Sequence, residues 1–293
     1  MEKLIQLTLS GIANGAIFSL VALGFVLIYK SSDVINFAQG ELLMIGAYLT
    51  YMMVQQFGLF WPIGVMIAVA LSAGVGVLIE QLVLRPLIGE SAISVIMVTI
   101  GLSSLLRAIV GAIWGVTPLP APQFLPRDPV RILGASVGID KLVAIALALV
   151  LFGLLTLFFR RSNEGIAMRA VADDQQAALS IGISIKRVWA VAWAIAAVTA
   201  AVGGILLISI FGGVSGTIGR VGLLVFPVVI LGGLDSIPGA IIGGLIIGLL
   251  QAFAGGYLPP DLGLGEVAPY VVLILILLIR PYGLFGQKLI ERV

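Results

Sequence analysis

Long apolar runs separated by short polar stretches make up most of this chain. A helix that crosses a membrane needs about 20 mostly apolar residues. The pattern therefore predicts an all-α, polytopic membrane protein with eight or nine transmembrane helices. The candidate spans are residues 4–29, 37–54, 60–84, 92–114, 141–159, 188–211, 222–234, 237–257 and 267–285.

The span at 222–234 is the shortest of these and leaves the count open. It contains Pro227 and ends at Gly232-Gly233, so it could be a tilted helix, a broken helix or a re-entrant segment. Non-helical backbone at membrane depth is tolerated only where protein or a watery cavity satisfies its polar groups. A broken segment here would then lie inside the bundle.

Composition agrees with a membrane protein and narrows its chemistry. Of the 293 residues, 60% are hydrophobic and only 10% are charged, whereas soluble domains are about one quarter charged. The net charge of +2 provides no basic field for nucleic acid. The chain has no Cys and no His, which removes thiolate chemistry and the commonest metal ligands. No segment reads as a soluble domain, so residues 1–293 form a single transmembrane domain.

Glycine pairs at small-xxx-small spacing predict close helix packing, because a missing side chain lets two helices approach. We expect this packing within one bundle rather than between chains. The pairs are Gly11–Gly15, Gly111–Gly115, Gly239–Gly243 and Gly244–Gly248.

The distribution of Lys and Arg predicts the orientation, since cytoplasmic loops carry an excess of both. If 160–187 is cytoplasmic and the chain crosses nine times, the N-terminus lies outside and the C-terminus inside. Ten basic residues are then inside: Lys30, Arg85, Arg160, Arg161, Arg169, Lys186, Arg187, Arg280, Lys288 and Arg292. Four are outside: Lys3, Arg127, Arg131 and Lys141. The longest outer loop, 115–140, contains five prolines, which favour extended or turn geometry.

The polar segment 160–187 predicts a short helix at the cytoplasmic surface. Asp173 and Asp174 precede the alanine-rich run "QQAALSI", and acidic residues suit a helix start. Gly182 follows the run, and glycine commonly ends a helix in a left-handed turn. We expect Ala177, Ala178 and Ile181 on one side of this helix and the polar residues on the other.

The sequence Gln176-Ala177-Ala178-x-x-x-Gly182 resembles the EAA---G loop of ABC importer permeases, with Gln in place of Glu. The chain is similar to one subgroup in particular, the permeases for branched-chain amino acids and related amides. The blocks that carry this resemblance are "EGIAMRAVADDQQAALSIGI" (164–183), "VINFAQGELLMIGAY" (34–48), "IEQLVLRPL" (79–87), "TIGLSSLLRAIVGAIWG" (99–115) and "GGLDSIPGAIIGG" (232–244).

The resemblance implies a permease subunit of the bacterial inner membrane that works by alternating access and catalyses no reaction. It implies a second homologous permease, two ATPase subunits and a periplasmic substrate-binding protein as partners. The 173–182 helix would be the coupling helix that contacts an ATPase. No P-loop motif occurs in the chain, so ATP and Mg²⁺ would bind only to the ATPase subunits, and this chain would hold no cofactor or metal.

Ionisable residues inside predicted spans are functional candidates, because charge at membrane depth is costly. Arg107 lies inside 92–114 and should face the bundle interior, and Glu41 is a possible partner. This pair could line a pathway for a zwitterionic solute or fix helix register. Neutral polar residues add candidates for the same pathway: Asn36, Gln39, Thr99 and Ser103.

The sequence leaves the cargo open. A urea or short-chain amide permease of the same family is a close alternative to a branched-chain amino acid permease. A secondary transporter driven by an ion gradient would need carboxylates at mid-membrane, and Glu41 and the kink at Pro227 are the only hints of one.

Overall fold

Helices dominate the computed structural model, which describes residues 1–122, 124, 129–132, 134–259, 263–280 and 282–286. Within these residues, six helical segments are long and apolar enough to cross a membrane. They are α1 (Glu2–Ser32), α3 with its irregular continuation (Trp61–Leu87), α4 (Ala92–Trp114), α5 (Ile139–Arg161), α8 (Ile185–Phe211) and α10 (Ile237–Tyr257). The prediction of an all-α polytopic membrane protein is confirmed.

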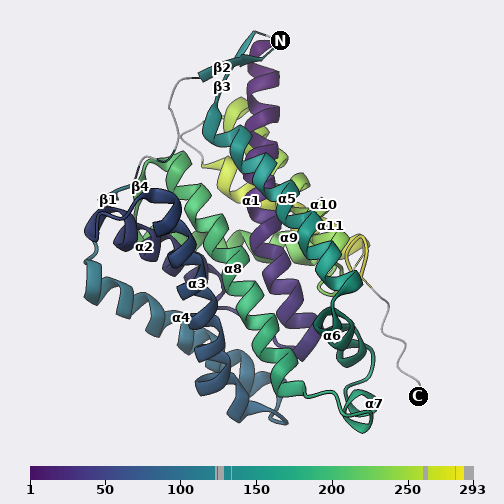
Figure 1. Ribbon diagram of the computed structural model, residues 1–293. Coiled ribbons are helices and arrows are strands. Elements are labelled where there is room, and N and C mark those ends of the chain that lie inside the picture. Colours follow the sequence, from purple (N-terminus) through teal and green to yellow (C-terminus); the bar gives the residue numbers. More distant parts are fainter. Residues whose placement is uncertain (123, 125–128, 133, 260–262, 281, 287–293) are drawn as a thin grey trace.

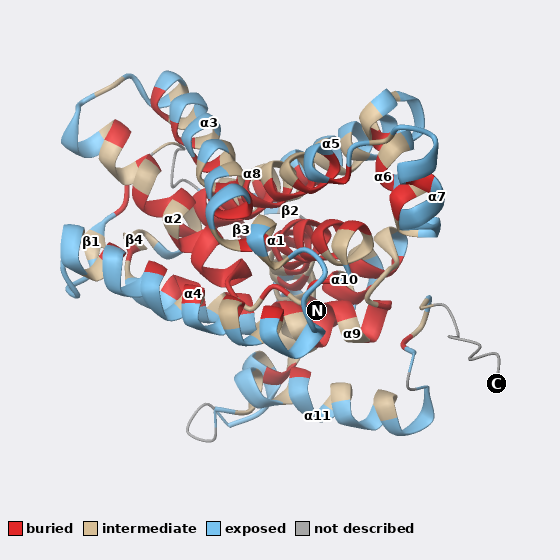
Figure 2. Ribbon diagram, turned by 90° about the horizontal axis from the view of Figure 1, so that it is seen from below, coloured by how far each residue is buried: buried red, intermediate tan, exposed pale blue. Residues whose placement is uncertain are grey.

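Helix α1 is the centre of the bundle and packs against α5, α8 and α10 (Figure 1). Its most apolar stretch is 89% buried by the chain itself, against 22% for the corresponding stretch of α5. A helix that is apolar on all sides must be surrounded by protein or by lipid. Here α1 is surrounded by protein, while α3, α4 and α5 expose much of their surface (Figure 2).

Glycines let the central helices approach backbone to backbone. A Cβ on Gly248 of α10 would lie 2.3 Å from the Gly15 nitrogen of α1, and one on Gly204 of α8 would lie 2.3 Å from the Leu43 carbonyl oxygen. The expected packing within the bundle therefore holds for the pairs in α1 and α10. It does not hold for Gly111–Gly115, since no described atom lies within 4 Å of a Cβ at either position.

The predicted span 37–54 is an α-helix over only part of its length. Helix α2 covers Gln39–Tyr51 and continues as the π-helical turn η1 (Met52–Gln56). Residues 33–38 between α1 and α2 form no regular helix, and the Gln39 amide reaches Val21 and Ala196, near the middles of α1 and α8. The chain thus returns into the bundle as irregular backbone before α2 begins.

The predicted span 222–234 is a broken helix, one of the three alternatives. It begins as the 3-10 helix η4 (Gly216–Leu224) and continues as α9 (Val225–Gly232), whose residues are mostly buried. Pro227 lies in the first turn of α9, where a missing N–H removes no helical hydrogen bond. As expected for irregular backbone, the segment lies inside the bundle, against α1, α2 and α10.

The last predicted span, 267–285, is shorter than expected. Helix α11 covers Leu264–Ile279. The chain then turns back, and the backbone N–H groups of Leu284 and Phe285 donate to the Leu231 and Gly232 carbonyls at the end of α9. Those carbonyls would otherwise lack partners at a helix terminus, which explains why the C-terminal segment folds back here.

The loop 115–140 has the extended geometry that its prolines predict. It contains β1 (Leu119–Pro120), which pairs with β4 (Gly213–Val214), and a hairpin of β2 (Pro129–Ile132) and β3 (Ala135–Gly138). The β2–β3 hairpin and the N-terminus lie at one end of the molecule, and α6 and α7 lie at the other (Figure 1). Arg127, Lys288 and Arg292, which entered the orientation count, lie outside the described residues.

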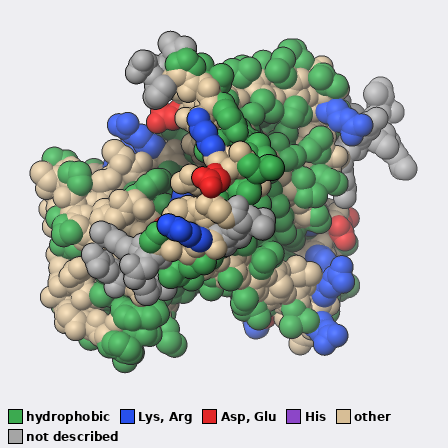
Figure 3. Space-filling model, turned by 90° about the horizontal axis from the view of Figure 1, so that it is seen from above, with side chains coloured by type: hydrophobic (Ala, Val, Ile, Leu, Met, Phe, Trp, Pro, Cys, Tyr) green, Lys and Arg blue, Asp and Glu red, His purple; other side chains and the backbone are tan. Residues whose placement is uncertain are grey.

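The outer surface is largely hydrophobic, as a lipid-facing surface requires. Large side chains such as Ile93 on α4, Leu149 on α5 and Leu278 on α11 are more than half exposed. Seen from the N-terminal end, hydrophobic side chains cover much of the surface, with charged ones in small groups (Figure 3). A soluble protein would not leave this much apolar area in contact with water.

Candidate functional site

The segment 160–187 forms two helices rather than one. Helix α6 (Asn163–Asp173) is capped by Ser162, whose hydroxyl accepts a hydrogen bond from the Gly165 backbone. Met168 and Val171 of α6 are buried against the bundle. Helix α6 is therefore docked, and it fixes the position of the shorter helix that follows.

Helix α7 (Gln175–Ser180) has a complete cap at each end. The Asp174 carboxylate accepts hydrogen bonds of 2.9 Å from the Gln176 and Ala177 N–H groups. At the other end Gly182 has φ +85°, and the N–H groups of Gly182 and Ile183 donate to Leu179 and Ala178. This is the Schellman arrangement, in which glycine avoids the strain of a left-handed residue.

Two expectations about this segment are corrected. Asp173 does not cap α7, because it is the last residue of α6. The coupling helix expected at about 173–182 is the six-residue helix Gln175–Ser180. Of its apolar residues only Ala178 is buried, while Ala177 and the following Ile181 are exposed. An apolar residue on a short surface helix need not face its own protein.

Helix α7 therefore presents most of its surface outward. Ala178 anchors it, while Leu179 and Ile181 are 53% and 76% exposed. An ion pair between Glu164 of α6 and Arg187 of α8, which the sequence reasoning did not single out, joins the two sides of the loop. The result is a small, rigidly capped helix with exposed apolar side chains, held away from the bundle (Figure 1).

A second group of predicted site residues lies around the irregular segment 33–38. Asn36 and Gln39 hydrogen-bond to each other, and the Gln39 amide also donates to the Val21 carbonyl. Thr99 of α4 donates to the Ile35 carbonyl. These side chains are buried. Thr99 and Asn36 satisfy backbone groups of the irregular segment, namely the Ile35 carbonyl and the Ala38 N–H. Their role in a solute pathway stays a prediction.

The predicted pairing of Arg107 with Glu41 is confirmed, at 2.5 Å between Arg107 Nη2 and Glu41 Oε1. The prediction that Arg107 faces the bundle interior is wrong. The Glu41 side chain is 3% exposed, but that of Arg107 is 57% exposed within the single chain. Arg107 lies beside the buried stripe of α4, so only its guanidinium reaches inward to the carboxylate.

Thr99, Ser103 and Arg107 are spaced four residues apart and so lie on one side of α4. The first contacts the 33–38 segment and the third contacts α2, while Ser103 is half-buried between them. The structure thus brings the predicted polar residues of α4 together along the α1–α2 connection. It does not bring them near α7, which lies beyond the end of α8.

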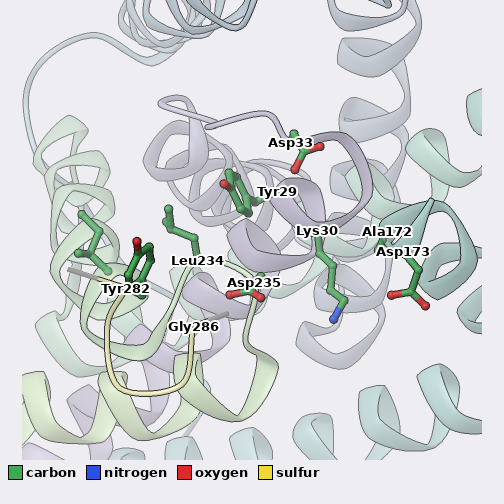
Figure 4. A pocket seen from close by; sticks show the side chains of 10 residues that line it. Tyr29, Lys30, Asp33, Ala172, Asp173, Leu234, Asp235, Tyr282 and Gly286 are labelled. Carbon is green, nitrogen blue, oxygen red and sulfur yellow. The ribbon is translucent and has the colours of Figure 1, made fainter. Parts of the chain in front are cut away.

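A cavity of about 290 Å³ opens at the end of the molecule that carries α6, and the sequence reasoning missed it. Its walls come from the end of α1, the end of α6, the α9–α10 connection and the C-terminal turn (Figure 4). Asp235 lines it, and the next residue, Ser236, caps α10, because its hydroxyl accepts a hydrogen bond from the Gly239 N–H. Burial raises the pKa of the Asp33 carboxyl in the same cavity.

Within the described residues, no group of three or more Asp and Glu side chains is arranged to hold a metal ion. The described residues form a membrane bundle with a broken helix, a charged pair whose carboxylate is buried, and a capped surface helix. This combination is typical of a transport subunit, because such a subunit needs a polar route through the bundle and a point of contact with other proteins.

Comparison with known proteins agrees with that class. The family described as "Branched-chain amino acid transport system / permease component" matches residues 7–279, and the chain belongs to this family. The predicted resemblance to branched-chain amino acid ABC permeases is thereby confirmed, and the chain is a transport subunit and not an enzyme.

Individual relatives match over almost the whole chain. The high-affinity branched-chain amino acid transport system permease protein LivH of Escherichia coli K12 is 32% identical, over 99% of this chain and 97% of its own length. BraD of Pseudomonas aeruginosa, a permease protein of the same description, is 31% identical over 99% and 98%. A probable LivH of Methanocaldococcus jannaschii is 30% identical over 91% and 88%. No solved structure matches the chain significantly.

Proposed function

We propose that this chain is the permease subunit of an ATP-driven importer that carries branched-chain amino acids into the bacterial cytoplasm by alternating access. The observation that carries the proposal is α7. It is capped at both ends, it is anchored by a single alanine, and its remaining side chains point outward. Such a helix suits the transmission of force from a partner, because capping keeps it rigid while its exposed apolar residues provide the contact.

The partner at α7 is an ATPase subunit in this proposal. The chain contains no P-loop and so has no recognisable means of its own to use ATP. Two ATPase subunits would bind ATP and Mg²⁺, close on each other and move α7. Because α6 is continuous with α7 through Asp174 and is packed on the bundle, movement of α7 would be passed to the transmembrane helices.

A second permease subunit would cover the side of α4 that carries Arg107. A guanidinium at membrane depth is costly against lipid, yet Arg107 is 57% exposed in the single chain. Gly111 lies four residues further on α4, with open space around it, which suits close approach by another helix. Both features support a subunit contact on this side, with the Arg107–Glu41 pair beside the solute pathway.

The orientation follows from the same scheme. The end with α6 and α7 would be cytoplasmic, and the end with the N-terminus and the β2–β3 hairpin would be periplasmic, in the inner membrane. A periplasmic binding protein would deliver the amino acid at that outer end. The predominance of basic residues at the α6–α7 end supports this assignment.

Cross-linking tests the proposal sharply, because the chain has no native cysteine. Ala177→Cys places a single thiol on the exposed surface of α7, and Ser136→Cys places one on the exposed part of the β3 hairpin at the opposite end. In the assembled transporter, a short thiol cross-linker should join A177C to an ATPase subunit and should not join S136C to one. Absence of the A177C product in transport-competent complexes would contradict the assignment of α7.

A further inference from the structure

The cavity beside α6 has the features of a binding site for a small molecule. It is lined by Tyr29, Lys30 and Asp33 from the end of α1, by Asp173 from α6 and by Leu234 and Asp235 from the α9–α10 connection. Its volume of about 290 Å³ is at the lower end for ligand pockets. It is large enough for a free amino acid.

The charges in this cavity are of both signs. Lys30 lies among three carboxylates, those of Asp33, Asp173 and Asp235, and its side chain points between Asp235 and Asp173 (Figure 4). None of the four takes part in an ion pair within the part of the chain that the structure describes. One ammonium and three carboxylates can together receive a carboxylate and an ammonium from a ligand.

An apolar wall accompanies these charges. Leu234 and Ile230 come from α9 and its end, and the ring of Tyr29 lies beside Leu234 (Figure 4). Lys30 and Asp235 provide opposite charges at one part of the cavity, and the aliphatic side chains provide a surface that an apolar group can cover. This is the pattern of a site that recognises both ends of an amphipathic zwitterion.

We propose that the cavity binds an aliphatic α-amino acid from the cytoplasm. The ligand's carboxylate contacts Lys30, its ammonium contacts Asp235, and its side chain packs on Leu234 and Tyr29. The site is separate from the Arg107–Glu41 pair, and it deepens the proposed function because its ligand has the chemistry of the imported solute and its access depends on the proposed orientation.

Occupancy of the cavity would affect transport through α6. Asp173 is both a wall of the cavity and the last residue before the α7 cap. A ligand that contacts α1, α6 and the α9–α10 connection together favours the arrangement in which these three elements are close. A ligand shifts a conformational equilibrium toward the state that it binds better, so accumulated product would slow further import.

Direct binding is the first test. The complete transporter, purified without its binding protein, should bind radiolabelled leucine. Isopentylamine and 4-methylpentanoate, which keep only the ammonium or only the carboxylate, should compete weakly. Asp235→Asn and Lys30→Met should each weaken leucine binding about tenfold or more. Glu90→Gln removes the same charge as D235N from an exposed position outside the cavity and should bind as the wild type does. Equal binding by all variants, or full competition by the amine alone, would overturn the proposal.

Transport into proteoliposomes is the second test, with ATP and unlabelled leucine enclosed and the binding protein outside. Enclosed leucine should lower the initial uptake rate of the wild type and E90Q, each relative to its own rate without enclosed leucine, and should have little effect on D235N. If enclosed leucine does not change the initial uptake rate of the wild type, this site is refuted while the importer assignment stands. A complex that imports no branched-chain amino acid would refute the proposed function, and the binding measurement would still judge the cavity.

Discussion

The cap on α7 gives the sharpest prediction, because one side chain holds the start of a helix that is too short to persist alone. Asp174 accepts hydrogen bonds from two backbone N–H groups, at 2.9 Å each. Asp174→Ala removes both, whereas Asp174→Asn keeps an oxygen that can accept them. Asp173→Ala is the matched control, since the neighbouring carboxylate lies at the end of α6 and makes no side-chain hydrogen bond within the described residues.

The magnitude follows from the capping energy. Loss of an N-cap costs about 1 kcal/mol, which is about a fivefold change in the ratio of formed to unformed α7 (1.4 kcal/mol being tenfold). A helix of six residues has no stability of its own in water, so the whole of this change should appear in the ratio of formed to unformed α7. Asp173→Ala should not lower this ratio, because the Asp173 carboxylate makes no hydrogen bond to α7 within the described residues. At the C-terminus of α6 that carboxylate also opposes the helix dipole, so its removal does not destabilise α6.

Hydrogen exchange of the assembled transporter measures this directly. The amides of residues 176–183 should exchange about fivefold faster in D174A than in the wild type, and at wild-type rates in D174N and D173A. ATP-dependent uptake should fall in D174A and be restored in D174N. Equal effects of D173A and D174A, or unchanged exchange in D174A, would refute the assignment of Asp174 as the cap.

Three further predictions concern the bundle. Arg107→Met should lower the melting temperature of the purified protein more than Glu41→Gln. It leaves the buried Glu41 carboxylate without a partner, a loss of about 3 kcal/mol, whereas E41Q leaves a guanidinium that is largely exposed. The reverse order would contradict the burial of Glu41. Trp189→Phe should destabilise by about 1–3 kcal/mol more than Trp193→Phe, since the Trp189 indole donates to the Ser31 carbonyl and the buried Trp193 indole has no partner within the described residues; equal melting temperatures would show that Trp193 has a partner after all. Gly204→Ala should destabilise the chain by about 1–3 kcal/mol, because the added Cβ would overlap the Leu43 backbone. Gly111→Ile should leave the isolated chain folded, because nothing in the described residues lies within 4 Å of a Cβ there. It should weaken association with the second permease, which gel filtration of the complex would show.

Much of this fold could be predicted from the sequence because lipid imposes strong rules on it. Every predicted span except 37–54, 222–234 and 267–285 became a helix long enough to cross. The first two begin in irregular or 3-10 backbone inside the bundle. At residues 33–38 a partner far away in the sequence satisfies the irregular backbone, because the Thr99 hydroxyl donates to the Ile35 carbonyl, and periodicity does not reveal such a partner.

The candidate sites divide in the same way. The ends of α7 were readable because Asp174 and Gly182 act on their immediate neighbours. The contact between Arg107 and Glu41 was readable because a buried charge needs an opposite one. The cavity at Lys30 and Asp235 was not, since it forms only where four distant segments meet. The side of α4 on which Arg107 lies was mistaken for the same reason: it depends on the packing of the whole bundle.

In the proposed function, this chain moves solute only when ATPase subunits act on α7. The most direct measurement is uptake of radiolabelled leucine into proteoliposomes that contain either the lone chain or the complete transporter with its binding protein. We expect ATP-dependent uptake by the complete transporter and none by the lone chain, with or without an ion gradient. Robust gradient-driven uptake by the lone chain would contradict it.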